Sequence, residues 1–544
     1  MAERLFGVET EYAIAGMNGH GIVDRGAILQ QLMDLAHHQL IHLPDLYSGG
    51  MFLQNGARLY IDCGMHPEMT TPECANPWDI ARYIQAGERM LAELSRTVES
   101  RQPAGAEIMC FRSNVDYGGT RATWGCHESY LHRMPPDALP PQVIPHLVSR
   151  VIYTGAGGFH PLSPGLEFTL SPRAAHIESV ISQESTARRG IFHTKNESLC
   201  RGGYNRLHIL CGESLCSEIA TFLKVGATAL VVAMAEAGLD PGTGVELASP
   251  LDALHSVSGD VTCHRPLPMA DGRSLTPIEI QRHYLGIAEA HAGEAFMPPW
   301  SAEVCRHWRT MLDQLEGAPR SVAGELDWAI KLPLYADYAG RHGVAWDLLP
   351  FWNEALSRLN AALERTAQRG QTVPIEVLIG PESPIPSEIE PLTSYLRSRG
   401  QQWDGLRQFV DLRQGLYEAD TRFGQLGAKG IFQSLDGAGV LDHRVGGIDN
   451  IEHAIANPPA VGRARIRGQV IQRLAGNNGS WHCDWQTIAD EEGHMLDLSD
   501  PFAAEESWHS PLTEESQPPV PPPNQTGPAT SAFQRYLAML RGRT

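Results

Sequence analysis

Acidic side chains at alternate positions near the N-terminus constrain the fold of this chain more than any other sequence feature. Residues 4–14 alternate in polarity, which predicts a half-buried strand. Because successive side chains of a strand point to opposite faces, Glu9 and Glu11 share one face. Two acids on one face repel each other unless water solvates them or a cation lies between them, and Mg²⁺ prefers oxygen ligands of this kind. The pattern therefore favours either a solvated sheet face or a metal site.

A second predicted strand, residues 55–62, also carries polar side chains on one face. Arg58 and Asp62 lie on that face with a tyrosine between them, and His66 and Glu68 follow shortly after. Asp62 is a candidate general base, because a carboxylate within hydrogen-bond reach of a proton can remove it. The alternative interpretation is a salt bridge between Arg58 and Asp62 on an edge strand.

A third predicted strand, residues 206–212, places Arg206 and His208 on one face. The guanidinium group suits phosphate and the imidazole suits a metal, although a lone histidine in an apolar strand is more often a core residue. Cys126 and His127 are neighbours in sequence and therefore point to opposite faces of an extended segment. This geometry argues against a thiol nucleophile paired with an adjacent base.

The three strands together supply acids for a metal, arginines for phosphate and an aspartate base. Such a set suits the transfer of a phosphoryl group to a carboxylate, because clustered cations neutralise the phosphate in transit. The chain contains no P-loop, GxSxG or GxGxxG motif that would favour a different chemistry.

Apolar spacing and end signals predict helices between and after these strands. Asp24 caps the first helix, and Asn76-Pro77 begins the second with a cap followed by proline. Two longer helices are predicted over residues 215–238 and 346–368. Lys224 lies in the first of these two and is expected to be solvated, unless the acids need a counter-charge.

Changes in composition suggest how the chain is divided. Glycine, proline and serine gather around residues 370–386, and the C-terminal segment is rich in proline. We expect a catalytic domain over residues 1–415, a small domain over residues 416–497 and a tether over residues 498–544. The tether ends in a short amphipathic helix, residues 532–541, which is expected to dock either on a partner or on its own domain.

The charge balance excludes one class of function. The chain has 43 Lys+Arg and 63 Asp+Glu, a formal net charge of −20, whereas a protein that coats nucleic acid needs a surplus of cations. No signal-peptide pattern leads the chain, and its most apolar stretch, residues 225–239, is too short and too charged to cross a bilayer. Ten cysteines without a CxxC pair favour reduced thiols. We therefore expect a cytoplasmic protein with neither nucleic-acid nor membrane partners.

Ordered sequence blocks resemble the Pup ligase and depupylase family, whose members are carboxylate–amine ligases and hydrolases related to glutamine synthetase. The resemblance spans roughly residues 4–490. It rests on Gly7–Tyr12, Asn55–Asp62, His66–Glu68, Gly125–Tyr130, Ser171–Ala174, Arg206–His208, Leu223–Gly226, Glu325–Trp328 with Lys331, Pro458-Pro459, Arg463–Gly468 and Asp484-Trp485.

The resemblance implies an α+β fold, in which a large glutamine-synthetase-like domain with a curved antiparallel sheet backed by helices is joined to a small C-terminal domain. It also implies ATP and Mg²⁺ as cofactors. ATP would phosphorylate a glutamate-type carboxylate, and an amine would then displace the phosphate to give an amide or isopeptide bond. The expected substrate is a protein or peptide, and a Pup-like tag is one candidate.

The resemblance also assigns roles by motif position. Asp62 is expected to take a proton from the incoming amine. The residues expected to hold Mg²⁺ are Glu9, Glu11, Glu68 and His208. The residues expected to contact the nucleotide are Arg58, Arg206, Arg463, Arg465 and Arg467.

Motif spacing bears on the choice between ligase and hydrolase. The depupylase branch usually has a long insertion between the first acidic motif and the catalytic aspartate, whereas only 53 positions separate Glu9 from Asp62 here, which favours ligation. Two segments depart from the family pattern: Lys195–Leu199 stands where Arg-Asp-Glu-Pro-His is usual, and Tyr417–Asp420 lacks the expected histidine. These departures bear on the substrate more than on the ATP chemistry.

Three alternative functions remain open at this point. A depupylase or deamidase-type hydrolase would use the same pocket, and a phosphotransferase would stop after phosphate transfer without an amine acceptor. A non-catalytic nucleotide-binding scaffold would recruit partners through its tail helix, but it would have no reason to keep the acids and the candidate base.

Overall fold

The computed structural model of this chain describes residues 4–19, 21–45, 48–183, 188–193, 199–368, 386–476 and 481–510. Lys195 to Ser198, most of the segment around residues 370–386 and the expected tail helix at residues 532–541 lie outside these ranges. The described part combines helices with sheets, as expected for an α+β protein.

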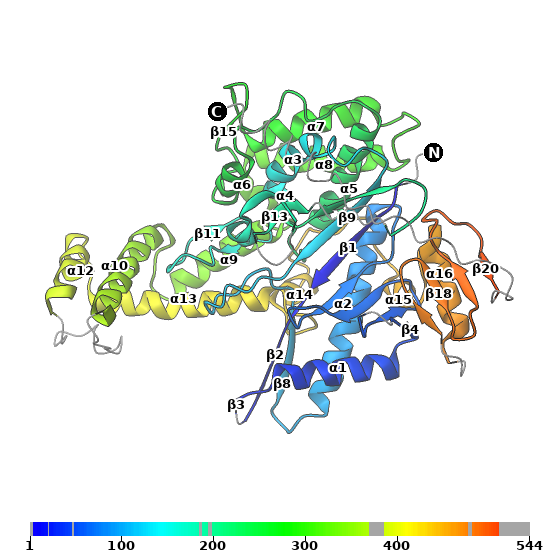
Figure 1. Ribbon diagram of the computed structural model, residues 1–544. Coiled ribbons are helices and arrows are strands. Elements are labelled where there is room, and N and C mark those ends of the chain that lie inside the picture. Colours follow the sequence, from blue (N-terminus) through cyan, green and yellow to red (C-terminus); the bar gives the residue numbers. More distant parts are fainter. Residues whose placement is uncertain are drawn as a thin grey trace.

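A nine-stranded sheet forms the centre of the described chain (Figure 1). All of its neighbouring strands pair antiparallel except the first two, which are parallel. Its strands, in spatial order, are β12 (Ser179–Ser182), β13 (Gly190–His193), β14 (Asn205–Ile209), β9 (Cys126–His132), β1 (Phe6–Glu11), β7 (Pro67–Thr70), β6 (Arg58–Ile61), β5 (Met51–Leu53) and β4 (His42–Pro44). The three strands predicted from polarity thus belong to one sheet.

Smaller sheets surround the central one. A three-stranded sheet consists of β3 (Gly21–Ile22), β2 (Ala13–Asn18) and β8 (Glu107–Phe111). Two hairpins pair β10 (Gly158–Phe159) with β11 (Phe168–Thr169), and β15 (Leu267–Pro268) with β16 (Ser274–Leu275). A four-stranded sheet near the C-terminus consists of β17 (His482–Cys483), β18 (Thr487–Ala489), β19 (Met495–Asp497) and β20 (Trp508–His509).

Helices cover the sheet and extend beyond it. The α-helices are α1 (Arg25–Gln39), α2 (Pro77–Ser100), α3 (Pro140–Ser149), α4 (Val151–Thr154), α5 (Glu218–Glu236), α6 (Pro250–Ser258), α7 (Pro277–His291), α8 (Ser301–Gly317), α9 (Asp327–Arg341), α10 (Leu349–Gln368), α12 (Pro386–Ser398), α13 (Trp403–Phe423), α14 (Ile431–Gly437), α15 (Ile451–Ala456) and α16 (Gly462–Leu474). Short 3₁₀ helices are η1 (Pro172–His176), η2 (Pro319–Val322) and η3 (Trp346–Leu348).

The predicted helix starts are confirmed at both capped positions. The Asp24 carboxylate accepts a hydrogen bond from the backbone N–H of Ala27 at 2.8 Å, and α1 begins at the next residue. The Asn76 side chain accepts from the N–H of Asp79 at 2.9 Å, and α2 begins at Pro77. Both contacts satisfy amide groups that have no partner inside the first turn of a helix.

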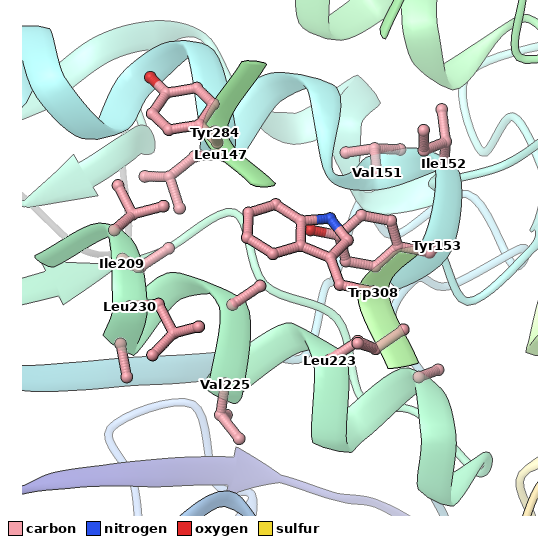
Figure 2. Close-up of a cluster of buried hydrophobic side chains, with 14 of the residues drawn as sticks. Leu147, Val151, Ile152, Tyr153, Ile209, Leu223, Val225, Leu230, Tyr284 and Trp308 are labelled. Carbon is pink, nitrogen blue, oxygen red and sulfur yellow. The ribbon is translucent and has the colours of Figure 1, made fainter. Parts of the chain in front are cut away.

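Helix α5 forms the centre of the largest hydrophobic cluster. Figure 2 shows Leu223 and Leu230 of this helix on the side of Trp308 of α8, whose ring is fully buried, and Val225 on the opposite side of the helix. By length and composition α5 could cross a membrane, but its most apolar window is entirely buried inside the protein. The helix is therefore part of the core.

The expected solvation of Lys224 is wrong, because this residue of α5 is only 3% exposed. Its ammonium group donates to the backbone carbonyl of Glu213 at 2.8 Å and lies 3.8 Å from a carboxylate oxygen of Glu128. A helix pattern predicts only which side of the helix faces apolar neighbours. In α5 every side is covered by the protein, so Lys224 is buried as well. The buried carboxylate nearby balances its charge.

The C-terminal strands pack against one edge of the central sheet. Residues of α16 and of the four-stranded sheet share a hydrophobic cluster with Leu43 of β4 and Phe52 of β5. The expected boundary between residues 415 and 416 lies inside the continuous helix α13. With α10 and α12, this helix forms an arm that projects from the rest of the molecule (Figure 1).

Candidate active site

Strand register gathers the polar side chains of five strands on one face of the central sheet. Directly opposed residues of antiparallel strands point the same way. Glu9 on β1 lies opposite His127 on β9 and Thr70 on β7, and Glu11 lies opposite Glu68 on β7.

The same register extends to the strands on either side, where it places Arg58 and Tyr60 of β6, and Arg206 and His208 of β14, on this face. The face that the sequence predicted for single strands is therefore continuous.

The first cluster on this face consists of Glu9, His127 and His208. Their candidate ligand atoms all lie within 4.8 Å of one another, and the carboxylate of Glu9 is 3.6 Å from Nδ1 of His127. Ser129 contacts Nδ1 of His208 at 3.2 Å. A side-chain carbon on Gly125 would lie 2.4 Å from Nε2 of His127, so this position requires glycine. The arrangement can hold a divalent cation between one carboxylate and two imidazoles.

The charge states of this cluster suit a cation. Burial alone would raise the pKa of Glu9, but a hydrogen bond with His127 and the charges of His208, His127 and Arg206 lower it below the ordinary value. Burial lowers the pKa of His208 to about 3, which leaves its imidazole neutral at pH 7. An ionised carboxylate and a neutral imidazole are the forms that bind metals.

The second cluster surrounds Glu11. Candidate ligand atoms of Glu11, Asp62 and His66 lie within 4.8 Å of one another. Glu68, which pairs with Glu11 across the strands, is only 5% exposed, and burial followed by the charges of Glu9 and Glu11 raises its pKa well above the usual value. Glu11, Asp62 and the buried Glu68 together create a strongly negative site, and a bound cation would reduce the repulsion between them.

Asp62 lies in a tight turn that follows β6. Its backbone N–H donates to the carbonyl of His66 at 3.0 Å, and the N–H of His66 donates to Oδ1 of Asp62 at 2.7 Å. Hydrogen bonding by His66 outweighs burial and lowers the pKa of Asp62. Asp62 is therefore ionised at neutral pH and able to accept a proton. The predicted alternative, a salt bridge with Arg58, is wrong, because Arg58 binds Asp45 with its Nε at 2.9 Å.

A cleft opens beside the first cluster, between the sheet and the C-terminal segment. It encloses a cavity of about 120 Å³ beneath a wider open mouth. Its lining includes Leu5, Phe6, Gly7, Val8, Glu9, Arg58, Tyr60, Thr70, Thr71, Glu73, Ser129, Tyr130, Leu131, Leu199, Arg206, Arg463, Trp485 and Pro501. Three of the five arginines predicted to contact a nucleotide thus line one cleft.

The other two predicted arginines are placed differently. Arg467 is fully buried and donates to both carboxylate oxygens of Glu73, at 2.8 and 2.9 Å. Arg465 is partly exposed and contacts the backbone carbonyl of Ala504 and the side chain of Gln469. Neither residue lines the cleft, although Arg463 does while also bonding to Glu73.

Sequence reasoning missed the roles that His127 and His66 take in the two clusters. His127 was considered only as a neighbour of Cys126, and the two do point to opposite faces: the Cys126 thiol is buried against Lys224 and Thr10. The sequence places His66 in a polar segment but assigns it no role. Alternation on a strand would have shown that His127 faces the same way as Ser129, but only the strand register shows that it meets Glu9.

The segment Tyr417–Asp420, which departs from the family pattern, makes its contacts away from the two clusters. The Asp420 carboxylate accepts hydrogen bonds from Tyr117 at 2.7 Å and from Tyr335 at 2.8 Å. The ammonium group of Lys331 lies 2.8 Å from the same carboxylate. These contacts attach α13 to α9 and to the segment between β8 and β9.

The fold and the site together define an α+β enzyme whose central sheet presents clustered acids and histidines beside a cleft with cationic side chains. A family model described as Pup-ligase protein matches residues 4–351. The chain belongs to this family, which confirms the resemblance found in the sequence.

Relatives of both reaction types occur among known proteins. Pup–protein ligase 1 of Rhodococcus erythropolis is 29% identical over 512 residues, which cover 92% of this chain and 97% of that protein. The Pup deamidase/depupylase of Mycobacterium tuberculosis is 36% identical over 315 residues, which cover 56% of this chain and 62% of that protein. The ligase match extends over nearly the whole chain, and the depupylase match is restricted to part of it.

Two solved structures share the fold. The complex between the prokaryotic ubiquitin-like protein Pup and its ligase PafA has a TM-score of 0.71 at 24% identity and covers 93% of this chain and 90% of that one. PafA in complex with ADP has a TM-score of 0.65 at 24% identity and covers 89% of this chain and 92% of that one. The likeness extends over nearly the whole of both chains.

Proposed function

We propose that this chain is an ATP- and Mg²⁺-dependent ligase that phosphorylates a glutamate-type carboxylate and joins it to a lysine amine as an isopeptide bond. The observation that supports this proposal most directly is the continuous sheet face that joins the two acidic clusters to Arg206 at the cleft. Family membership and the full-length ligase relatives point to the same reaction, and a Pup-like tag is the proposed donor.

The donor atoms on the sheet face fit divalent cations. Glu11 and Glu68 offer the carboxylate oxygens that Mg²⁺ prefers, and the buried acid of Glu68 needs a compensating positive charge. Glu9, His127 and His208 offer a mixed set, because imidazole suits Mn²⁺ or Zn²⁺ better than Mg²⁺. Mg²⁺ would neutralise the phosphates of ATP at this face when bound.

The residues of the chain supply the remaining requirements of the reaction. Arg206 lies 4.0 Å from Glu9 at the rim of the cleft, where its guanidinium can contact a phosphate transferred toward the donor carboxylate. The transfer yields an acyl phosphate and ADP. The amine then attacks the acyl carbon, the carbon–oxygen bond to phosphate breaks, and Asp62 accepts the proton that the amine loses.

A hydrolase acting in the same site is the second candidate. Its support is the depupylase relative, which is more similar over the segment that it matches than the ligase relative is over the whole chain. In that reaction Asp62 would assist attack on an existing isopeptide bond. The spacing of 53 positions between Glu9 and Asp62 favours the ligase.

The remaining expectations rest on the same family. We propose a glutamine-synthetase-like curved sheet, a small C-terminal domain and a cytoplasmic location. The roles of Arg58 and Arg463 in nucleotide binding are supported by their place in the cleft. The proposed roles of Arg465 and Arg467 have no such support from the cleft.

The deciding experiment supplies the purified chain with ATP, Mg²⁺, a Pup-type peptide ending in glutamate and a lysine-bearing acceptor protein. A ligase gives one ADP and one phosphate per isopeptide bond. Incubation of a preformed conjugate separates the second candidate, because only a hydrolase releases the tag without consuming ATP stoichiometrically. Phosphorylated peptide without amide product would instead identify a phosphotransferase.

A further inference from the structure

Two histidines far along the sheet from the proposed active site face each other at the end of α1. Nδ1 of His37, in the last turn of α1, lies 3.0 Å from Nε2 of His42, the first residue of the edge strand β4. Their ring centroids are 4.9 Å apart and the rings are inclined by 65°. His37 is exposed and His42 is partly exposed, so the pair is open to solvent.

The hydrogen bonding of His42 fixes which of its nitrogens is available. Its Nδ1 lies 2.8 Å from the backbone carbonyl of Leu40, and a carbonyl can only accept a hydrogen bond. Nδ1 of His42 therefore carries the proton, and its Nε2 accepts a hydrogen bond from Nδ1–H of His37. A metal ion would replace this proton, because the neutral ring of His37 can carry its proton on Nε2 instead. Metal-binding histidines commonly use this arrangement, in which the second ring nitrogen donates to a backbone carbonyl.

The distance between the two nitrogens matches adjacent ligands on one metal ion. With metal–nitrogen bonds of about 2.05 Å, two ligands at a right angle are about 2.9 Å apart and two tetrahedral ligands about 3.3 Å apart. The separation between His37 and His42 is 3.0 Å, a hydrogen-bond distance that also lies between these two values, so both rings could reach one ion with little movement.

The electrostatic surroundings also favour a cation. Asp34, one turn earlier on α1, lies close enough for its negative charge to act on His37. The chain as a whole carries a formal net charge of −20, which attracts cations to its surface.

We propose that His37 and His42 form a binding site for a divalent transition-metal ion such as Ni²⁺ or Cu²⁺, separate from the catalytic cations. A metal bound there would link the C-terminal end of α1 to the edge strand β4. Asp45, directly after β4, holds Arg58 of the cleft, so the bound ion would stabilise the segment that supports this arginine.

Titration calorimetry with Ni²⁺ on the full-length chain tests the site, in the presence of excess Mg²⁺ and ADP. Wild type is compared with His37→Gln, His42→Gln and the matched control His38→Gln, which changes an exposed histidine on the same helical turn. We expect the His37 and His42 variants each to bind one Ni²⁺ fewer per chain, and the control to bind the wild-type number. The catalytic clusters and the group of Asp490, Glu492 and His494 contribute equally to all four proteins, so the difference isolates the pair.

Two further readouts keep the test decisive. Ni²⁺ should raise the thermal midpoint of wild type and of His38→Gln more than that of the other two variants, because binding to the native state alone stabilises it. With EDTA the four midpoints should agree, which shows that the substitutions leave the fold intact. Equal Ni²⁺ stoichiometry in all four proteins, or loss in only one of the two pair variants, would overturn the proposal.

Discussion

The carboxylate of Asp62 is held at both of its oxygens by a single residue, His66. The backbone N–H of His66 donates to Oδ1 at 2.7 Å, and its ring Nδ1 lies 3.3 Å from Oδ2. Gly64 makes this contact possible, because a side-chain carbon there would lie 2.8 Å from Nδ1 of His66 and 3.1 Å from Oδ2 of Asp62. The turn therefore fixes the direction in which the candidate base presents its lone pairs.

Replacing Asp62 tests its role as the base. Asp62→Asn keeps the shape of the side chain but removes the charge that accepts a proton. We expect kcat for isopeptide formation to fall by about 10²–10⁴-fold, the usual contribution of a general base. ADP affinity, measured by calorimetry, should stay within twofold of wild type. An unchanged kcat would show that another group takes the proton.

His66 is expected to act through Asp62 rather than directly on substrate. His66→Ala should lower kcat by about 10- to 100-fold, the scale of a misplaced catalytic group, and leave the Mg²⁺ concentration for half-maximal activity unchanged. In the Asp62→Asn background the same substitution should have no further effect. His66→Asn, which retains a side-chain donor, should recover part of the rate. Additive losses in the double variant, or a shifted Mg²⁺ requirement, would instead make His66 a direct participant or a metal ligand.

The strand patterns predicted the polar face well because alternation is a local property. The side chains of Glu9 and Glu11 point to the same face, as do those of Arg206 and His208, because β1 and β14 are regular strands with alternating side chains. The partners of these residues depend on strand order, which brings residues 9, 68, 127 and 208 together from four separate segments. No local sequence pattern specifies that strand order, so the place of His127 beside Glu9 becomes evident only once the fold is known.

Buried charge was the least predictable feature. Lys224 lies among apolar residues of its helix, whereas Arg467 follows two other arginines at alternate positions, Arg463 and Arg465. Neither pattern shows whether the cation is solvated, bound to a ligand or buried. In the structure each is buried against an acid supplied by a distant strand or its flank, Glu128 for Lys224 and Glu73 for Arg467. The pairing partner decides whether such a cation is buried, and the sequence does not reveal that partner.

The assignment of His127 as a metal-site residue gives a third prediction. His127→Ala removes one of the three groups around Glu9 and should raise the cation concentration for half-maximal activity by at least about tenfold. Mn²⁺ should support more residual activity than Mg²⁺ if His208 still contributes its imidazole. The control is His494→Ala, which alters a histidine in the separate cluster between β18 and β19. Equal cation requirements in the two variants would contradict the assignment.

The buried pair of Arg467 and Glu73 is expected to stabilise the attachment of α16 to the sheet. Arg467→Met removes the fully buried partner of the Glu73 carboxylate but leaves its bond with Arg463, so it should lower the free energy of unfolding by about 1.5–3 kcal/mol at pH 7. Arg465→Met, two residues away and partly exposed, should change it by less than about 0.5 kcal/mol. Urea unfolding measures both values. Similar losses in the two variants would show that the helix, rather than the ion pair, carries the effect.

The same pair predicts how stability depends on pH. Burial alone would raise the pKa of Glu73, but the charges of Arg467 and Arg463 lower it below the ordinary value of about 4.3 for glutamate. Because the folded pKa is depressed, the stabilisation is fully present above the unfolded value and is lost as pH falls toward the folded one. The difference in unfolding free energy between wild type and Arg467→Met should therefore be largest near pH 7 and shrink progressively below about pH 4.3. Urea unfolding at a series of pH values measures this difference, and a constant difference down to pH 3 would mean that Glu73 is not ionised in the native protein.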